Sequence, residues 1–358
     1  MACSVGGGIL AGFQENVRFF GRTYEEDGIR YFNWTASGFE FAFEGTRAEA
    51  ELVTNQAGEE GKTAYLNVFV DGREEPADAR TIKLDAPRKR YVLAEDLPYG
   101  KHTVKVIKRT GNLTGGSDPA KLSTKAGLVS LSIPGGKWLP APAPKRRKLE
   151  FIGDSITVGA ELGREPAPVP LDDGWKTYAA YAARALDADF HVLAISGNGV
   201  ICSVFGEPLF ELPDEFPWTD RYNKPGLRWD HAQYQPDVVV VNLGTNDLAG
   251  IGPGKRFTRR QFEDAYAAFL LEIKSKYPQA KVIGALGAMS EGKDDLFPQV
   301  EAALARANAQ YGETFGYSLR LVDNVAEDGR AGDHPSEKAH IKHGKALVAR
   351  IREITGWS

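Results

Sequence analysis

The stretch "EFIGDSITVG", residues 150 to 159, decides the fold of the second half of the chain. Its apolar run has the pattern of the end of a buried β-strand, and that run breaks at Gly153. Asp154 and Ser155 then stand on the turn, and Gly159 follows four residues beyond the serine. Ser155 therefore lies at a predicted strand-to-helix junction, where it is either a nucleophile or the N-cap of the next helix.

From this junction to the end of the chain, strand-like and helical segments alternate. The strand-like segments are residues 148–153, 190–196, 236–244, 280–287 and 319–324, and the helical ones are 174–188, 260–277, 296–312 and 337–354. Continuous apolar strands, each followed by an amphipathic helix, predict a parallel sheet covered on both faces. Ligands of such sheets bind beyond the carboxyl ends of the strands, which is where Ser155 stands.

The first part of the chain has a different pattern. From about Val17 to Ile133 apolar and polar residues mostly alternate, in short runs separated by Gly, Pro, Asp and Asn, which predicts antiparallel strands in a β-sandwich or jelly roll. The connector "IPGGKWLPAPAPKRRK", residues 133–148, is too rich in Pro and Gly to continue a central strand. We therefore predict a β-sandwich (jelly-roll) domain over residues 1–140 and an α/β/α three-layer domain over 141–358.

Composition limits the classes of partner. The 358 residues include 42% hydrophobic and 26% charged residues, and the formal net charge is −4, so we expect neither nucleic acid nor an anionic membrane as a partner. Cys3 and Cys202 fit no disulfide framework and no zinc spacing, so no cofactor is expected. Residues 1–13 lack a basic region followed by an apolar run, which favours a cytoplasmic protein; removal of an export signal from a secreted protein would leave the same pattern. The oligomeric state stays open.

Two further strand ends contribute polar groups at the same predicted edge. Gly197 follows the second strand in "ISGNG", and Asn246 follows the third in "NLGTNDL". A backbone N–H that a glycine leaves accessible and an Asn amide are donors suited to an oxyanion hole, because they stabilise negative charge as it develops. Read separately, Gly197 is more often a turn glycine and Asn246 a turn-capping side chain; their positions after successive predicted strands favour the shared role.

A serine nucleophile needs a base, and His334 is the histidine placed on a loop after the last strand. It lies in "GRAGDHPSEKAH", where Pro335 and Ser336 prepare a helix start. The other five are less well placed: His102 is in the β domain, His191 begins a strand, His231 is in a long loop, and His340 and His343 fall inside the last helix.

Together the blocks "FIGDSITVG", "ISGNG", "NLGTNDL" and "DHPSEKAH", in that order, resemble those of the SGNH (GDSL) hydrolase superfamily over roughly residues 147–356. The resemblance implies that Ser155 is the nucleophile and His334 the base. It also implies an oxyanion hole made by the Ser155 N–H, the Gly197 N–H and the Asn246 side chain.

A further resemblance, to carbohydrate esterase family 2, rests on the β domain, the connector and the "HPSEKAH" block taken together. In the β domain the resemblance is one of architecture more than of individual residues. This resemblance implies a two-domain, metal-independent deacetylase that removes O-acetyl groups from xylan, glucomannan or related sugars. An acetylated oligosaccharide or polysaccharide is then the expected substrate.

The acid that usually orients the histidine is missing from its expected position. Three residues before His334 stands Ala331, and the nearest acid is the adjacent Asp333, whose side chain reaches its neighbour's Nδ1 only at a poor angle. The resemblance accommodates a Ser–His dyad in which a backbone carbonyl fixes the imidazole, so we predict a dyad. Asp333 is the candidate third member, and Asp328 is the other.

The long segment between Val200 and Gln235 is rich in aromatic residues, which argues against disorder and for a functional loop. Its rings are Phe205, Phe210, Phe216, Trp218, Tyr222 and Trp229. Such rings stack on sugars or anchor the loop, and we predict Trp218 and Trp229 as sugar contacts.

Acidic residues between these rings favour a polar, small-acyl substrate over a lipid. They are Glu207, Glu211, Asp214, Glu215, Asp220 and Asp230. The alternatives that stay open are a short-chain lipase or esterase, an acyl-thioesterase using Arg221, Lys224 and Arg228 for phosphates, and a non-catalytic carbohydrate-binding protein.

Overall fold

The computed structural model describes residues 16–58, 62–112, 123–163, 172–209, 211–289, 295–322 and 325–358. Cys3 and Phe210, named above, lie outside these ranges. None of the helices within them is long and apolar enough to cross a membrane.

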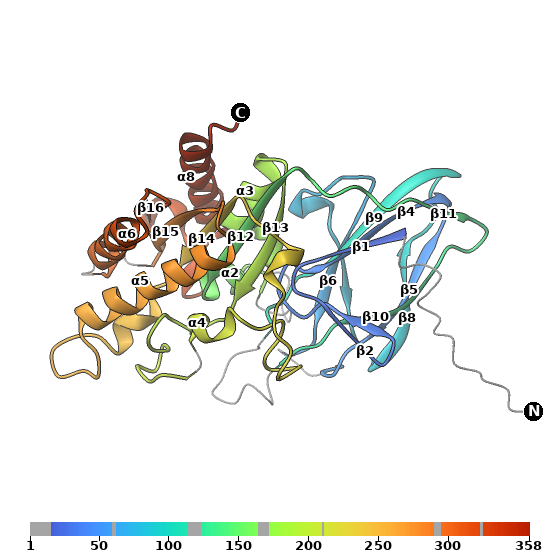
Figure 1. The fold of residues 1–358 in the computed structure, drawn as a ribbon. Helices are drawn as coiled ribbons and strands as arrows, with labels where there is room; N and C mark the ends of the chain where they lie inside the picture. Colours follow the sequence, from blue (N-terminus) through green and yellow to red (C-terminus); the bar gives the residue numbers. More distant parts are fainter. Residues whose placement is uncertain are drawn as a thin grey trace, which may run out of the picture.

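Two antiparallel sheets form a sandwich in the first part of the chain (Figure 1). One sheet has the order β1 (Val17–Phe20), β4 (Gly38–Gly45), β9 (Gly100–Lys108), β6 (Tyr65–Val70) and β7 (Arg80–Lys83), with β11 (Lys137–Leu139) paired to β4. The other has the order β2 (Tyr24–Glu26), β3 (Ile29–Tyr31), β10 (Gly127–Ser132), β5 (Ala48–Val53) and β8 (Arg88–Ala94). Every second residue of β5 is buried, which is the alternation read from the sequence. The predicted β-sandwich is confirmed.

The second part is built on a five-stranded parallel sheet, which confirms the predicted α/β class. Its order is β13 (Ala188–Ala194), β12 (Arg147–Gly153), β14 (Val238–Asn242), β15 (Lys281–Gly287) and β16 (Gly316–Leu321). All five residues of β14 are buried, as expected for a strand with both faces covered. β11 ends at Leu139 and β12 begins at Arg147, so the predicted boundary at 140/141 falls in the segment between them.

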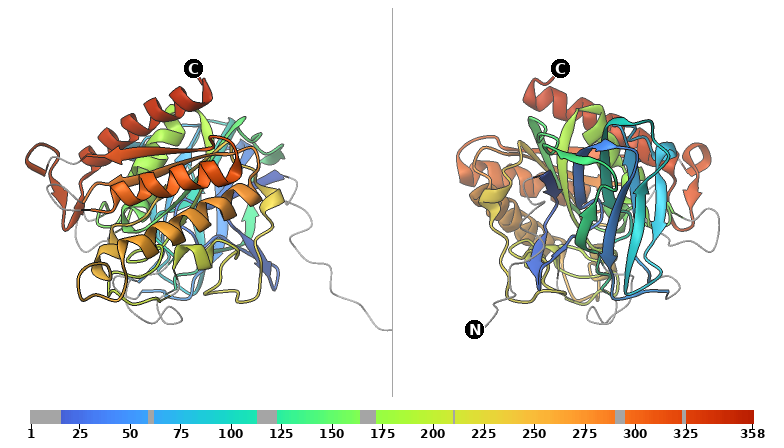
Figure 2. Two further views of the ribbon diagram at one scale, coloured as in Figure 1. Left: turned by 60° about the vertical axis from the view of Figure 1, so that its left-hand side comes forward. Right: turned by 90° about the vertical axis from the view of Figure 1, so that its right-hand side faces the viewer.

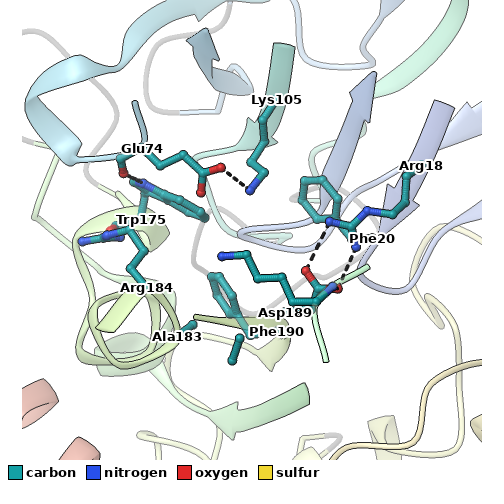
Figure 3. A pocket seen from close by; sticks show the side chains of 11 residues that line it. Arg18, Phe20, Glu74, Lys105, Trp175, Ala183, Arg184, Asp189 and Phe190 are labelled. Atoms are coloured by element: carbon teal, nitrogen blue, oxygen red, sulfur yellow. Dashed lines mark hydrogen bonds and ion pairs between the residues drawn. The ribbon is translucent and has the colours of Figure 1, made fainter. Parts of the chain in front are cut away.

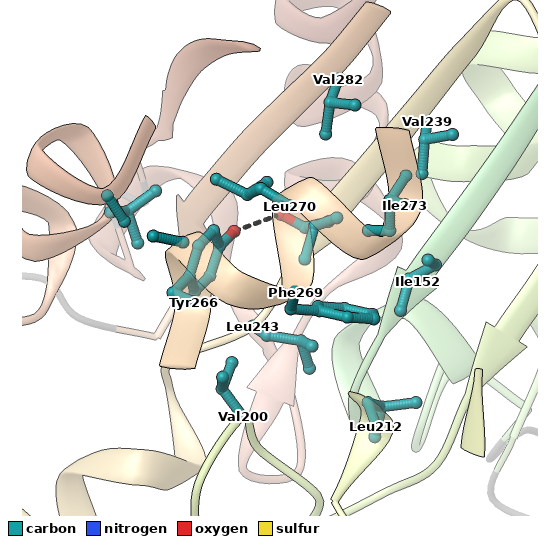
Figure 4. Packing of buried hydrophobic residues seen from close by; sticks show 14 of the residues in the cluster. Ile152, Val200, Leu212, Val239, Leu243, Tyr266, Phe269, Leu270, Ile273 and Val282 are labelled. Atoms are coloured by element: carbon teal, nitrogen blue, oxygen red, sulfur yellow. Dashed lines mark hydrogen bonds between the residues drawn. The ribbon is translucent and has the colours of Figure 1, made fainter. Parts of the chain in front are cut away.

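Helices cover both faces of this sheet (Figure 2). On one side lie α5 (Arg259–Lys276) and α6 (Phe297–Tyr311), and on the other α3 (Tyr178–Ala185) and α8 (Glu337–Thr355). Neighbouring residues of β12 point to opposite sides, so Ile152 packs in the core under α5 and Phe151 in the core under α3 and α8. Figure 4 shows the first of these cores, where Tyr266 also donates a hydrogen bond to the Val241 carbonyl at 3.2 Å.

Short elements complete the chain and are mostly found at turns. They are the helices α2 (Ser155–Val158), α4 (Leu212–Glu215) and α7 (Val325–Asp328), the 3-10 turns η3 (Pro76–Asp78), η4 (Gly174–Lys176), η5 (His231–Gln233) and η6 (Asn246–Ala249), and the strands β17 (Arg330–Ala331) and β18 (His334–Pro335).

Charged side chains join the two parts at the amino-terminal edge of the parallel sheet. Figure 3 shows a pocket there, in which Arg18 contacts Asp189 at 2.8 Å and Lys105 contacts Glu74 at 2.5 Å, beside Trp175. Asp189 is the second residue of β13, whereas Ser155 follows the last residue of β12 by two positions. Since β12 and β13 are parallel, this pocket and Ser155 lie at opposite edges of the sheet.

Candidate active site

Asp154, and not Ser155, caps the helix at the strand-to-helix junction. The Asp154 side chain accepts a hydrogen bond from the Ile156 N–H at 3.0 Å, and α2 ends after one turn at Gly159, whose φ is +82°. Gly153 allows the turn to close tightly, because a Cβ there would lie 2.0 Å from the Thr157 hydroxyl. Ser155 is thus the first residue of the helix and does not serve as its N-cap.

Asn246 brings the three strand ends together. Its Nδ2 donates to the Asn198 carbonyl at 2.9 Å and, more weakly, to the Asp154 carboxylate at 3.3 Å. Gly197, next to Asn198, has a φ of +82° in the turn after β13, a conformation that favours glycine. In the described part of the chain, the N–H groups of Ser155 and Gly197 donate to no protein acceptor. Two backbone donors and one amide therefore converge near the serine.

Asp247, which the sequence reasoning overlooked, holds the segment that follows Gly197. Its buried carboxylate accepts hydrogen bonds from the N–H groups of Val200, Ile201 and Cys202 at 2.8 to 3.3 Å. Burial raises the pKa of Asp247 to about 6, and the three N–H groups limit that rise. The signal in the sequence was an acid directly after Asn246, at the end of a buried strand.

His334 lies on a small hairpin and contacts a carboxylate from a distant part of the sequence. Its strand β18 pairs with β17 in the register Ala331 to His334. The imidazole Nδ1 lies 2.9 Å from Oε2 of Glu161, and both side chains are mostly buried, with 22% and 17% exposed. Glu161 follows α2 by three residues, so this contact ties His334 to the segment that begins with Ser155.

Glu161 is thus a carboxylate neighbour of His334 that the sequence analysis did not consider beside the predicted Ser–His dyad and the candidate acids Asp333 and Asp328. Asp333 contributes its backbone N–H, which donates to the same Glu161 oxygen at 2.7 Å. The Asp328 carboxylate instead pairs with Lys342 at 2.7 Å. Gly332, between Ala331 and Asp333, leaves room for the Glu161 contact, because a Cβ there would lie 2.1 Å from Glu161 Oε1.

Most rings of the loop between Val200 and Gln235 anchor it. Trp229 is only 8% exposed and packs against the Arg22 guanidinium and His191, so the prediction that it contacts sugar is wrong. Trp218 is half-buried, with the Arg228 guanidinium 4.1 Å from its ring centroid, and its proposed sugar contact stays a prediction.

The acids of this loop also serve its internal structure more than its surface. Glu211, Glu215 and Asp220 are buried. Glu211 accepts from the Leu209 N–H at 2.7 Å, and Asp220 accepts from Asn33 of the sandwich at 2.6 Å. Three of the six acids are therefore buried in the loop and do not indicate whether the substrate is polar.

Phe205 and Val204 are the apolar side chains of this loop that reach solvent beside the candidate site. They are 63% and 49% exposed. The Val204 N–H donates to the Gly197 carbonyl at 2.7 Å, which places both residues next to the glycine turn. An exposed ring beside backbone donors is suited to stack on a sugar.

The arrangement as a whole is suited to acyl transfer. It combines a serine at a helix start, two backbone donors, an amide, and an imidazole held by a carboxylate. Within the described ranges, no group of three or more His, Cys, Asp or Glu is arranged to hold a metal ion.

Comparisons with known proteins match both parts of the chain. Residues 151–341 match the model of the GDSL-like lipase/acylhydrolase family, and residues 19–134 match the N-terminal domain of carbohydrate esterase 2. The chain is 26% identical over 353 residues to an acetylxylan esterase / glucomannan deacetylase of Cellvibrio japonicus, covering 97% of this chain and 91% of that protein.

Two further proteins, one of them a solved structure, are similar over nearly all of this chain. The chain is 31% identical over 330 residues to the cellulase/esterase CelE of Acetivibrio thermocellus; the match covers 90% of this chain but only 38% of that protein's length. The solved structure of a family two carbohydrate esterase from Clostridium thermocellum, in complex with cellohexaose, is similar with a TM-score of 0.80 and 27% identity, over 96% of this chain and 100% of that one.

Proposed function

This chain belongs to the GDSL-like lipase/acylhydrolase family, and from that premise we propose that it is a serine esterase that removes O-acetyl groups from carbohydrates. The observation that supports this most directly is the convergence of separate strand ends on Ser155. Asn246 links Asp154 to the Gly197 turn, and Glu161 links His334 to the segment after α2. Each link joins residues far apart in sequence.

The proposed reaction has two halves. His334 takes the proton of the Ser155 hydroxyl, whose oxygen attacks the acetyl carbonyl carbon, and the carbonyl oxygen becomes an oxyanion. The bond from the carbonyl carbon to the sugar oxygen then breaks, and His334 gives its proton to the departing sugar alcohol. A water molecule, deprotonated by His334, attacks the acetyl-serine; acetate leaves and the serine regains its proton.

The proposed oxyanion hole uses donors that are unpaired or weakly paired within the described protein. The N–H groups of Ser155 and Gly197 have no acceptor within the described protein, and Asn246 makes one weak contact of 3.3 Å, to Asp154. A substrate oxyanion that replaces this weak contact gains a third donor without breaking a strong hydrogen bond. Such interactions are worth most in the transition state, where the charge is largest.

A carbohydrate ester is the substrate class that we propose. The first part of the chain matches a domain of carbohydrate esterases, and the related proteins named above are a deacetylase of acetylxylan and glucomannan and an esterase that binds cellohexaose. Phe205, exposed beside Gly197, is the proposed sugar contact on this chain.

Acetate release tests the proposal. We expect the parent enzyme to release acetate from acetylated xylo-oligosaccharides and 4-nitrophenyl acetate and to cleave 4-nitrophenyl octanoate poorly. Ser155→Ala is expected to lower kcat at least about 10³-fold, and Asp333→Ala to change it little, because the Asp333 backbone makes the contact. Phe205→Ala is expected to raise KM for the oligosaccharide alone.

Other outcomes would contradict the proposal in separate ways. Release of no acetate by the parent from any substrate would exclude an acetylesterase and leave carbohydrate binding as the alternative. Faster cleavage of octanoate than of acetate would indicate the lipase class, and undiminished activity of Ser155→Ala would exclude the serine mechanism.

A further inference from the structure

Given the proposed esterase function, we propose that the β-sandwich takes a direct part in positioning the catalytic histidine: Arg109 fixes the segment carrying Glu161, and Glu161 orients His334. Glu161 and Arg109 are positioning residues in this scheme. The inference rests on the contacts described below.

The Glu161 carboxylate holds both the imidazole and the turn that carries it. Oε2 accepts the Asp333 N–H at 2.7 Å and lies 2.9 Å from His334 Nδ1. A carboxylate on Nδ1 selects the tautomer whose Nε2 accepts the serine proton, and it stabilises the imidazolium that then forms. The acid thus comes from the segment after the serine instead of from the histidine loop.

Glu161 needs external support, because its backbone is strained. Its φ is +65°, in the left-handed region that residues with a side chain seldom occupy, and this costs about 1 kcal/mol or more. The helix preceding it has a single turn, which contributes little rigidity of its own. Such a conformation persists only where the surrounding structure fixes it.

Arg109 supplies that support from the sandwich, directly after β9. Its guanidinium donates to the carbonyls of Gly163 at 2.8 Å and Asp172 at 3.1 Å, and it pairs with the Asp173 carboxylate at 3.3 Å. The side chain is 8% exposed. One buried arginine therefore joins the segment that follows Glu161 to the segment that precedes α3.

The two segments are joined a second time, close to Glu161. The Asp173 N–H donates to the Gly159 carbonyl at 2.8 Å, and the contact is so close that a Cβ on Gly159 would lie 2.3 Å from the Asp173 carbonyl oxygen. Glu161 thus lies between Gly159 and Gly163, two positions that are both fixed through Asp173 and Arg109. Any shift of Arg109 is transmitted to both ends of this five-residue stretch.

Other sandwich residues approach the same place. The Gly111 N–H donates to the Asp172 carboxylate at 3.0 Å. Burial raises the pKa of Asp172, and the Gly111 N–H and Lys108 act against that rise. A second residue of the sandwich therefore holds the segment next to Asp173.

Removal of either positioning residue should lower the rate of the chemical step more than substrate binding. We expect Glu161→Gln to lower kcat about 100-fold with KM changed less than threefold, since an amide favours the wrong tautomer. Arg109→Lys keeps a charge beside Asp173 but loses the forked contact with two carbonyls, and we expect kcat to fall about tenfold. Glu161→Asp is expected to retain part of the activity.

Two readouts separate positioning from a loss of stability. In the double variant, kcat should equal that of Glu161→Gln alone, because Arg109 acts through Glu161. The downfield proton NMR signal of an imidazole N–H bonded to a carboxylate should be present in the parent, absent in Glu161→Gln, and shifted or broadened in Arg109→Lys. Arg22→Lys, which alters another buried arginine between the domains, is the matched control and should keep kcat within twofold.

Several results would overturn the inference. Full kcat in Glu161→Gln would remove its first step. Additive losses in the double variant, or an equal loss in Arg22→Lys, would show that Arg109 acts through stability alone. An inactive parent would instead defeat the proposed function, and the NMR signals, which need no substrate, would still test the contacts among these residues.

Discussion

At the scale of single residues, Gly332 tests how closely Glu161 must approach the hairpin. A Cβ at this position would lie 2.1 to 2.3 Å from three atoms of the Glu161 carboxyl group, and the φ of +58° also disfavours a side chain. Gly332→Ala should therefore displace the carboxylate from His334. We expect kcat for 4-nitrophenyl acetate to fall at least about tenfold, measured together with the free energy of unfolding.

Gly329 provides the control, because a side chain there would strain the backbone without a steric clash. Its φ is +74°, yet no atom lies within 4 Å of the position that a Cβ would take. Gly329→Ala should cost about 1 kcal/mol of stability and leave kcat within twofold. Equal kcat values for the two variants would show that the clash with Glu161 has no influence on the reaction.

At the scale of elements, the loop between Val200 and Gln235 contains buried acids whose ionisation destabilises it. Burial raises the pKa of Glu215, at the end of α4, to about 7, and Arg221 only partly opposes this. Between pH 4.5 and about 7 the unfolded chain loses this proton while the folded chain keeps it, so stability falls as pH rises. We expect the parent to lose about 2 kcal/mol more than Glu215→Gln between pH 5 and 8.5, measured by urea denaturation.

Asp214, exposed in the same helix, serves as the control for this effect. Asp214→Asn should follow the pH dependence of the parent, because this substitution leaves the buried Glu215 carboxyl group in place. A stability difference between parent and Glu215→Gln that stays constant from pH 5 to 8.5 would show that Glu215 is ionised throughout that range.

These two scales explain which features the sequence could predict. Ser155, Gly197 and Asn246 stand within four residues of the ends of β12, β13 and β14, and His334 lies in a short recognisable block, so local motifs were sufficient to propose them. The Glu161 contact joins residues 173 positions apart and depends on two left-handed backbone conformations, which no short motif encodes. Trp229 was misread for a similar reason, since its burial depends on Arg22 from the other domain.

At the scale of the whole molecule, Arg22 joins the sandwich to the centre of the α/β domain. Its buried guanidinium donates to the carbonyls of Phe216 and Trp218 at 2.8 and 2.7 Å and pairs with Glu150 of β12 at 3.0 Å. Both charged side chains are 1% exposed, so each would be costly alone. The two domains should therefore unfold together in the parent.

Loss of this arginine should weaken both domains at once. Arg22→Met leaves Glu150 buried without its partner, and we expect a loss of about 3–5 kcal/mol in the free energy of unfolding, measured by chemical denaturation with fluorescence and far-UV circular dichroism. The double variant Arg22→Met/Glu150→Met should recover part of that loss, because it removes the unpaired charge. Arg47→Gln, at an exposed ion pair within the sandwich, should change stability by less than about 1 kcal/mol. If Arg22→Met cost no more than Arg47→Gln, the domains would be held together by their other contacts, among which that of Arg109 would then be the first to test.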